Sequence, residues 1–430
     1  MKVLMFGWEF PPHIAGGLGT ACEGIVKGLA HNGVETLFVM PSASGDEDQS
    51  CATILNASDV AVNHESDTVE EFLNKVKFIN VDSSIVPYVD PEEYFEAIEK
   101  MKREQTKETT VGFGQKFKFS GKYGANLLEE VSRYAQVGGT IAMQHAGEFD
   151  VIHAHDWLTY LAGIAAKELS GKPLVVHVHA TSFDRGTDDM VDSRVYSIEK
   201  RGMEAADRVV TVSDLTRNIV INKYGIDPAK VVTVHNAVDF SGRENLQVDR
   251  GVRDKVVTFL GRITFQKGPE YFIEAAAKVL KRTKNVRFVM AGSGDMMNRA
   301  IRQVARLGIS DRFHFTGFLR GQEVQKMFAL SDVYIMPSVS EPFGISPLEA
   351  MRSNVPSIIS HQSGAAEVLK YALKVDFWDV DAMADDIYAL LQYPALSDFA
   401  NRQGFDEVNA LKWNNATLKL KKVYESVVNS

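Results

Sequence analysis

Short apolar runs alternate with amphipathic stretches along this chain, and the alternation constrains its fold more than any other feature. The runs are rich in β-branched side chains, which is typical of parallel strands buried on both faces. They occupy residues 2–6, 36–40, 151–153, 174–178, 208–212, 231–235, 256–260, 287–291, 313–316, 333–336 and 357–359. Between them, spacings such as Leu18, Cys22, Val26 and Leu29 predict helices with one buried face. The pattern predicts an α/β protein with doubly wound parallel sheets.

The alternation restarts near residue 255, which divides the chain into two parts. Residues 241–254 are polar and contain two glycines, as expected of a linker. We therefore expect two Rossmann-like domains that face each other across a cleft, at residues 1–240 and 250–410. Residues 41–135 are less regular and rich in Glu, Lys and Asp, so we expect them to decorate the first domain.

Composition and charge exclude several classes of protein. The 430 residues include 47 basic and 56 acidic side chains, a net charge of −9, which argues against a nucleic-acid or anionic-membrane binder. Two cysteines, Cys22 and Cys51, supply neither a disulfide framework nor a cysteine-ligated zinc site, so we expect a cytoplasmic protein. Residues 2–6 are too short for the apolar core of a signal peptide, and no uncharged apolar run reaches the length of about 18 residues that suggests a membrane span.

A glycine-rich turn follows the first predicted strand. Gly16, Gly17 and Gly19 precede a helix, and glycines in such a turn let the backbone approach a ligand at the free N–H groups of the helix. Cys22 stands where a dinucleotide fingerprint needs its third glycine, and the second strand ends in Met40-Pro41 without an acidic residue. These departures argue against NAD binding, and close packing alone would also account for the turn.

Two predicted strands of the first half end in histidines. His153 and His155 precede Asp156, and His177 and His179 are spaced to share one face of the next strand. The second pair could bind a metal ion, but a histidine that bonds a carbonyl inside the strand, with its neighbour beyond the strand end, is the more usual arrangement. Ligands of open α/β sheets lie beyond the carboxyl ends of the strands, which makes His179 a candidate cleft residue.

Two acid-x-acid patterns could bind Mg²⁺ or Mn²⁺ through carboxylate oxygens. Asp379 and Asp381 lie where a helix is expected to begin, so helix capping is the preferred interpretation. Asp46 and Asp48 lie in a polar loop. We expect no catalytic metal site from either pair.

The second half contains the strongest cluster of polar motifs. Arg262 and Lys267 flank a loop at a strand end, where two cations would suit a diphosphate unless both are merely solvated. Glu341 and Glu349 bracket a turn after another strand, and carboxylates accept hydrogen bonds from sugar and ribose hydroxyls. These carboxylates also fit two different roles. Ser346 and Glu349 match a helix capping box, and paired carboxylates serve glycoside hydrolases.

In order and spacing, these motifs resemble the retaining nucleotide-sugar glycosyltransferases of the GT-B fold, families 4 and 5, and in particular the glycogen and starch synthases. The resemblance spans nearly the whole chain. It rests on Gly16-Gly17-Leu18, His155-Asp156-Trp157, His179, His235-Asn236-Ala-Val238-Asp239, Gly261-Arg262, Gln266-Lys267-Gly268, Gly292-Ser-Gly294, Glu341-Pro342-Phe343-Gly344 and Glu349-Ala350.

The resemblance implies a role for each matching residue. Gly16, Gly17, Leu18, Gly292, Pro342, Phe343 and Gly344 would line the donor site, Arg262 and Lys267 would neutralise the donor diphosphate, Glu341 would hold the sugar and Glu349 the ribose. His179 would lie near the reacting carbon, and Asp156 near the acceptor. Catalysis would need neither a cofactor nor a metal ion, and residues 413–430 would return to the first domain as a helix.

The resemblance also bears on the substrates. UDP-glucose or ADP-glucose would be the donor and an α-glucan such as glycogen the acceptor. Ile14 stands where bacterial ADP-glucose-dependent synthases have a lysine, so we expect UDP-glucose as the donor at least as much as ADP-glucose. A lipid, small-sugar or cell-surface polysaccharide acceptor, a GT-B sugar-nucleotide epimerase, and a catalytically inactive carbohydrate-binding protein are the alternatives. The oligomeric state stays open.

Overall fold

The computed structural model describes residues 1–13, 16–62, 115–121, 126–186, 191–238, 248, 251 and 253–429. Three features of the sequence therefore lie wholly or largely outside the described residues: Ile14, Asp239 with most of the 241–254 linker, and residues 63–114 of the irregular region.

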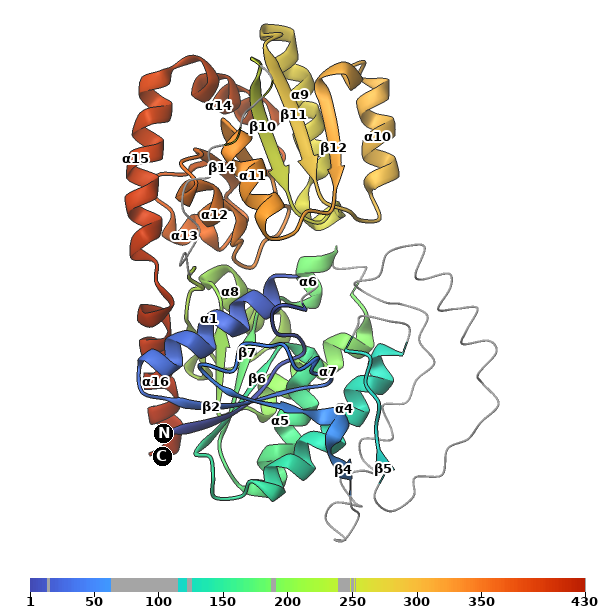
Figure 1. Ribbon diagram of the computed structural model, residues 1–430, viewed down its shortest axis with the longest axis vertical. Coiled ribbons are helices and arrows are strands. Elements are labelled where there is room, and N and C mark those ends of the chain that lie inside the picture. The colour runs from blue at the N-terminus through green and yellow to red at the C-terminus, as the bar shows by residue number, and fades with distance from the viewer. Residues whose placement is uncertain are drawn as a thin grey trace, which may run out of the picture.

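The first domain is built on a seven-stranded parallel sheet, as the apolar runs predict (Figure 1). In spatial order its strands are β3 (Thr53–Asn56), β2 (Glu35–Met40), β1 (Lys2–Phe6), β6 (Val151–His155), β7 (Leu174–Val178), β8 (Arg208–Thr211) and β9 (Val231–Thr233). Its helices are α1 (Gly17–His31), α4 (Leu127–Gln144), α5 (Trp157–Ser170), α6 (Ser182–Arg185), α7 (Ser193–Ala205), α8 (Asp214–Tyr224) and α16 (Trp413–Val428). A separate antiparallel pair joins β4 (Ala61–Val62) to β5 (Gln115–Lys116), and η1 (Ala57–Asp59) and η3 (Pro228–Lys230) are short 3-10 turns.

Alternate residues of these strands enter two different cores. Leu4 and Ile152 belong to the core that contains α4, α5 and α7. Val3 and Val151 belong to the core that contains α1 and α16. This alternation follows from the two-residue period of a strand, and it explains why runs that are apolar at every position form this sheet.

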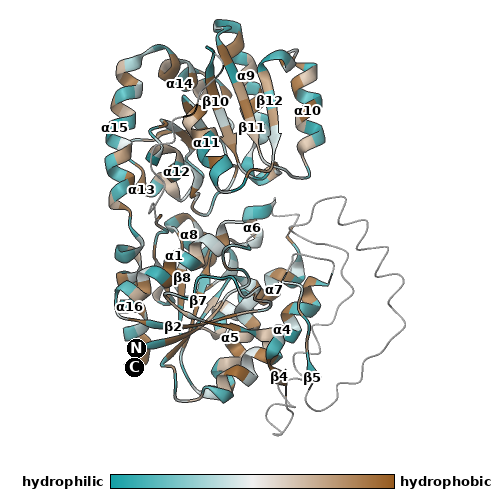
Figure 2. Cartoon of the chain, viewed as in Figure 1, coloured by the Kyte–Doolittle hydropathy of each residue, from teal (hydrophilic) through white to brown (hydrophobic). Residues whose placement is uncertain are grey.

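The second domain has a six-stranded parallel sheet. In spatial order its strands are β12 (Phe313–Gly317), β11 (Val286–Ala291), β10 (Lys255–Leu260), β13 (Val333–Met336), β14 (Ser357–Ser360) and β15 (Leu373–Val375). Its helices are α9 (Pro269–Arg282), α10 (Met297–Arg306), α11 (Gln322–Leu330), α12 (Ser346–Arg352), α13 (Ala365–Val368), α14 (Val380–Gln392) and α15 (Pro394–Ala410), with 3-10 turns η4 (Phe265–Lys267) and η5 (Ser310–Arg312). The helices that flank both sheets mix hydrophilic and hydrophobic residues, as amphipathic helices do (Figure 2).

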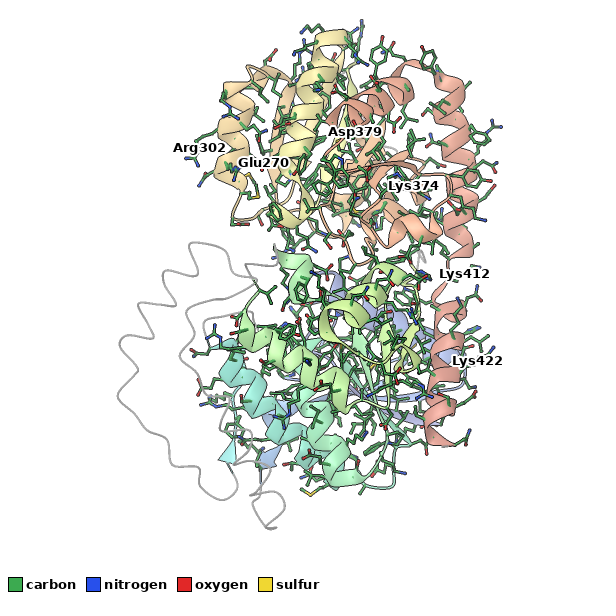
Figure 3. The ribbon with its side chains drawn as sticks, turned by 180° about the vertical axis from the view of Figure 1, so that it is seen from behind. Glu270, Arg302, Lys374, Asp379, Lys412 and Lys422 are labelled. Carbon is green, nitrogen blue, oxygen red and sulfur yellow. The ribbon has the colours of Figure 1, made fainter. Side chains whose placement is uncertain are left out.

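The chain returns to the first domain at its last helix. It leaves α15 beside Lys412, between the two domains, and continues into α16 (Figure 3). Helix α16 lies against α1 so closely that a Cβ built on Gly24 would stand 2.1 Å from the Trp413 ring. The two segments that pass between the domains touch, because the Val238 amide donates to the Leu411 carbonyl at 3.3 Å.

Candidate active site

In each sheet the strand order reverses at one point. The polar motifs follow the strands on either side of that point. In the first sheet, β2 and β6 lie on opposite sides of β1. In the second, β11 and β13 lie on opposite sides of β10. The loops after β1 and β6, and after β10 and β13, therefore diverge at these points and leave room for a ligand. The Gly16 turn and Asp156 belong to the first pair of loops, and Lys267 and Glu341 belong to the second.

The glycine turn presents backbone to solvent. Gly16 and Gly17 are exposed, and a Cβ built on either one would meet no atom within 4 Å. Leu18 is half-buried and packs against the first-domain cores. Oε1 of the buried Glu9 accepts the Gly19 amide at 3.1 Å, so a carboxylate already satisfies one N–H of the first turn of α1.

Asp156 holds the backbone that carries His179. Its Oδ1 accepts the amides of His179 at 2.7 Å and Ala180 at 3.3 Å, and its own φ of 58° is unusual for a residue other than glycine. Burial raises the pKa of Asp156 to about 7, and the Arg185 guanidinium and the two amide hydrogen bonds limit the rise.

His179 is a neutral imidazole at this site. Its Nε2 lies 2.9 Å from Nδ1 of His155, and desolvation lowers the pKa of His179 to about 3. Because it carries no charge near neutral pH, His179 can donate or accept a hydrogen bond but cannot act as a cation.

The expectation that the histidine inside the strand hydrogen-bonds a carbonyl is wrong for His177. Neither ring nitrogen of His177 has a hydrogen-bond partner among the described residues, although the side chain is buried. The His177 ring instead stacks on both His155 and His179, with ring centroids 5.3 Å and 4.4 Å away.

Lys267 and Glu341 form an ion pair between the loops that follow β10 and β13. The Lys267 Nζ donates to Glu341 Oε2, and only 9% of the Glu341 side chain is exposed. Two further bonds fix these loops: the Val339 amide donates to the Gln266 carbonyl at 2.8 Å, and Arg262 donates to Gln266 Oε1 at 3.2 Å. The pair places one cation and one hydrogen-bonding carboxylate at the point where the strand order of the second sheet reverses.

Several residues expected to line a donor site act here through close packing. A Cβ on Gly292, which has a φ of 144°, would stand 1.8 Å from the Gly261 carbonyl oxygen. Phe343 is 2% exposed in a hydrophobic core, Pro342 is buried, and Gly344 has a φ of 91°, which favours glycine. These residues set the course of the loops beside Lys267 and Glu341.

The capping-box interpretation of Ser346 and Glu349 is wrong. Helix α12 begins at Ser346, its N-cap is Ile345, and no side chain caps it. The Ser346 hydroxyl instead accepts a hydrogen bond from the Tyr334 hydroxyl at 2.7 Å. Glu349 lies half-buried in the first turn of this helix.

A hydrogen bond that the sequence did not indicate joins the two domains beside the ion pair. Ser340 Oγ donates to Asp184 Oδ1 at 2.6 Å, and Asp184 Oδ2 accepts the Thr181 amide and hydroxyl. Helix α6, which carries Asp184, also contacts the η4 turn that ends at Lys267. The order Thr181-Ser-Phe-Asp184 is a capping signature that could have marked this loop as structured.

A second contact between the domains is centred on Glu367 of α13. Its carboxylate accepts the Asp214 and Leu215 amides at the start of α8, at 2.9 Å and 2.8 Å, and lies 2.7 Å from His235 Nε2. The two domains are thus bonded at two separate places in addition to the segments that connect them.

The acid-x-acid patterns have local partners. Asp379 caps α14 by accepting the Ala382 amide at 2.9 Å, which confirms its expected role, and Asp381 pairs with Lys278. Asp46 lies 3.0 Å from His13, and Asp48 accepts the Ser50 amide at 2.9 Å.

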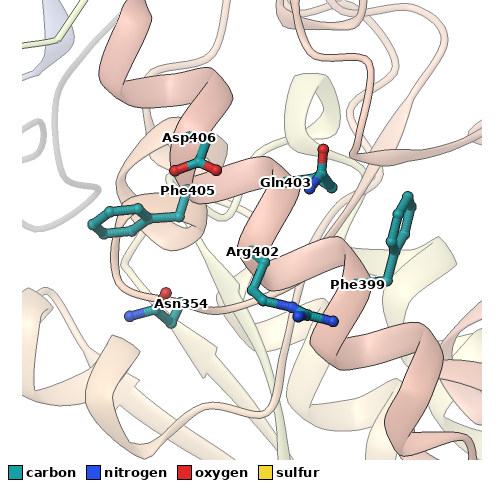
Figure 4. Close-up of a pocket in the computed structure, with 6 residues that line it drawn as sticks. All are labelled: Asn354, Phe399, Arg402, Gln403, Phe405 and Asp406. Carbon is teal, nitrogen blue, oxygen red and sulfur yellow. The ribbon is translucent and has the colours of Figure 1, made fainter.

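One surface hollow lies away from the strand-end loops. It is a depression of ≈ 370 Å³ beside α15 (Figure 4). It is lined by Asn354, Phe399, Arg402, Gln403, Phe405 and Asp406, none of which belongs to the glycine, histidine or carboxylate motifs. Within the described part of the chain, no helix combines the length and the apolar character needed to cross a bilayer.

Comparison with known proteins places both halves of the chain in one functional group. Residues 2–233 match the family of the starch synthase catalytic domain, and residues 243–404 match the group 1 glycosyl transferases. An uncharacterized glycosyltransferase of Methanocaldococcus jannaschii is 26% identical over 99% of this chain and 98% of its own length. A glycogen synthase of Mycobacterium tuberculosis is 22% identical over 99% and 94%, respectively.

Solved structures share the architecture. The sucrose-phosphate synthase of Thermosynechococcus elongatus superposes with a TM-score of 0.71 at 16% identity, covering 99% of this chain and 98% of that protein. Since the first family model spans more than half of the 430 residues and the second covers most of the remainder, the chain belongs to the glycogen and starch synthase-like glycosyltransferases of the GT-B fold.

Proposed function

We propose that this glycosyltransferase moves glucose from UDP-glucose or ADP-glucose to an α-glucan, with retention of the anomeric configuration. The ion pair between Lys267 and Glu341 carries the proposal, because it holds a cation for a diphosphate beside a carboxylate for sugar hydroxyls. The match to the starch synthase catalytic domain and the full-length similarity to a glycogen synthase support the choice of acceptor.

In this proposal the donor takes over the contacts of the ion pair. The diphosphate, with its larger negative charge, would draw Lys267 away from Glu341, and Arg262 beside it would bind the other phosphate. Glu341 would then be free to accept hydrogen bonds from the glucose hydroxyls. The two cations would also stabilise the negative charge that develops on the leaving nucleotide.

The remaining residues act at the edges of this site. The exposed backbone of Gly16 and Gly17 would contact the phosphates, and Glu349 would bind the ribose. The neutral His179 would hydrogen-bond the sugar near the reacting carbon, and Asp156, which positions it, would lie toward the acceptor. Closure of the domains would exclude water from the donor.

Nucleotide release measures the proposed reaction directly. Purified protein is incubated with UDP-glucose or with ADP-glucose, each with and without glycogen, and free UDP or ADP is quantified. We expect release that depends on glycogen and prefers one nucleotide. Slow release that ignores glycogen would point to another acceptor or to an epimerase, and no release with either donor would overturn the glucosyl transfer.

Removal of the Ser340 hydroxyl tests whether the bond to Asp184 matters for catalysis. Ser340→Ala should lower kcat/KM by about 3- to 10-fold, the effect of one hydrogen bond, because the loop beside Glu341 loses its tie to the first domain. Ser197→Ala, an exposed serine on α7, is the matched control. If kcat/KM were equal in both variants, the hydrogen bond between Ser340 and Asp184 would contribute nothing to catalysis.

A further inference from the structure

Four histidines lie on one face of the first sheet, between β6 and β7. His153 and His155 come from β6, and His177 and His179 come from the end of β7, where His155 and His177 are register partners. Neighbouring rings are close, with centroids 4.1 Å apart for His153 and His155 and 5.3 Å apart for His153 and His177. The cluster belongs to the face that packs on α1 and α16, where Tyr424 contacts His153.

Three of these side chains have nitrogens without partners in the protein interior. His153 and His155 are 0% exposed and His177 is 1% exposed. Within the described residues, Nε2 of His153, Nε2 of His155 and both nitrogens of His177 make no hydrogen bond. A buried polar atom without a partner has lost its hydrogen bonds to water and gained none in return, so several in one place point to a ligand that satisfies them.

Nitrogens of these three rings lie close together, although the His177 ring is stacked on His153 and His155 at interplanar angles of 22° and 26°. One nitrogen from each of His153, His155 and His177 lies within 4.8 Å of the other two. Nitrogens that bind one tetrahedral Zn²⁺ at about 2.1 Å stand about 3.4 Å apart, so rotation of the rings toward a common centre would close the difference. Burial lowers the pKa of all three imidazoles well below the usual value, which keeps their lone pairs available.

The opposite nitrogens of two rings already have outer partners. His153 Nδ1 lies 2.7 Å from the Tyr424 hydroxyl, and His155 Nδ1 lies 2.9 Å from His179 Nε2. Metal-binding histidines commonly donate their second N–H to a hydrogen-bond acceptor, which fixes the tautomer and the ring orientation, and the tyrosine hydroxyl and the second imidazole can each accept one. The cluster therefore combines three closely placed nitrogens with outer hydrogen bonds on two of the three rings.

We propose that His153, His155 and His177 bind one divalent transition-metal ion, best matched by Zn²⁺, inside the first domain. Imidazole ligands select zinc and its neighbours over Mg²⁺ or Ca²⁺, which prefer oxygen. A water would be the fourth ligand of the tetrahedral ion, which would tie β6 to β7 and, through Tyr424, β6 to α16. The proposal is independent of the donor and the acceptor, and it leaves the transfer reaction free of metal.

Metal content of the full-length protein tests the proposal. The protein is stripped with a chelator, loaded with Zn²⁺, dialysed and analysed by plasma mass spectrometry, and a second sample is loaded with Co²⁺. We expect one Zn²⁺ per chain, visible absorption bands of tetrahedral Co²⁺, and a fall in Tm on chelation. A buried water is the rival occupant, and it would give none of these results.

Variants assign the ion to the cluster. His177→Asn should lose the ion and the Co²⁺ bands, and its Tm should no longer respond to chelator. If His177→Asn fails to fold, His153→Gln serves in its place, and the wild-type measurements stand without either variant. The control is His235→Asn, which disrupts the other group of three candidate ligands within the described residues, Asp214, His235 and Glu367. Substoichiometric Zn²⁺ in the wild type, or loss of the ion only in His235→Asn, would overturn the proposal.

Discussion

Glu341→Gln should lower kcat by about 10²- to 10³-fold, the range found when one group that stabilises a transition state is removed. Glutamine keeps the shape of the side chain but removes the charge that binds Lys267, and it accepts through a single oxygen. Initial rates at saturating donor measure the effect, and circular dichroism checks the fold. Asp381→Asn is the matched control, because Asp381 also pairs with a lysine of the second domain but is exposed.

The double variant with Lys267→Met separates catalysis from stability. Removal of one partner of a largely buried pair leaves the other charge uncompensated, so Glu341→Gln alone should also lose some stability. Adding Lys267→Met should recover that stability without recovering activity. Transfer at a near-normal rate in either single variant would show that the donor site lies elsewhere.

Trp413→Ala should lower the free energy of unfolding of the protein by about 3–5 kcal/mol, the usual cost of truncating a buried aromatic side chain. Trp413 is 6% exposed at the start of α16, and its indole rests directly on Gly24 of α1. Urea unfolding followed by circular dichroism gives the change.

Leu418→Ala is the control for this substitution. It shortens an apolar side chain on the same helix that is 46% exposed, so the free energy of unfolding should change by no more than about 0.5 kcal/mol. Equal stabilities of Trp413→Ala and Leu418→Ala would mean that the contact between α16 and α1 contributes little to folding.

The fold followed from the sequence wherever strands are buried on both faces. Val256–Leu260 is apolar at most positions, and it is the core of β10. Two edge strands carry no such signal. β3 is exposed or half-buried along its length, and β15 is a three-residue strand with a lysine at its centre. Edge strands are often short and carry charged side chains, so an apolar run need not mark them.

Local motifs identified the loops of the candidate site but not every bond within them. Lys267 and Glu341 stand in loops that the glycines and strand ends mark, yet their pairing across 74 residues has no local signature. The bond between Ser340 and Asp184 depends on how two domains meet, which no short pattern encodes. Ser346 fitted a capping box by spacing alone, but Tyr334 competes for its hydroxyl.

The position of α16 has a consequence for how the protein is made. Trp413–Val428 emerges from the ribosome almost 400 residues after α1, whose apolar face it covers. Until then the second domain can complete its sheet while the first still exposes Val26 and Leu29. We therefore expect the first domain to expose an apolar face to chaperones until α16 has been synthesised.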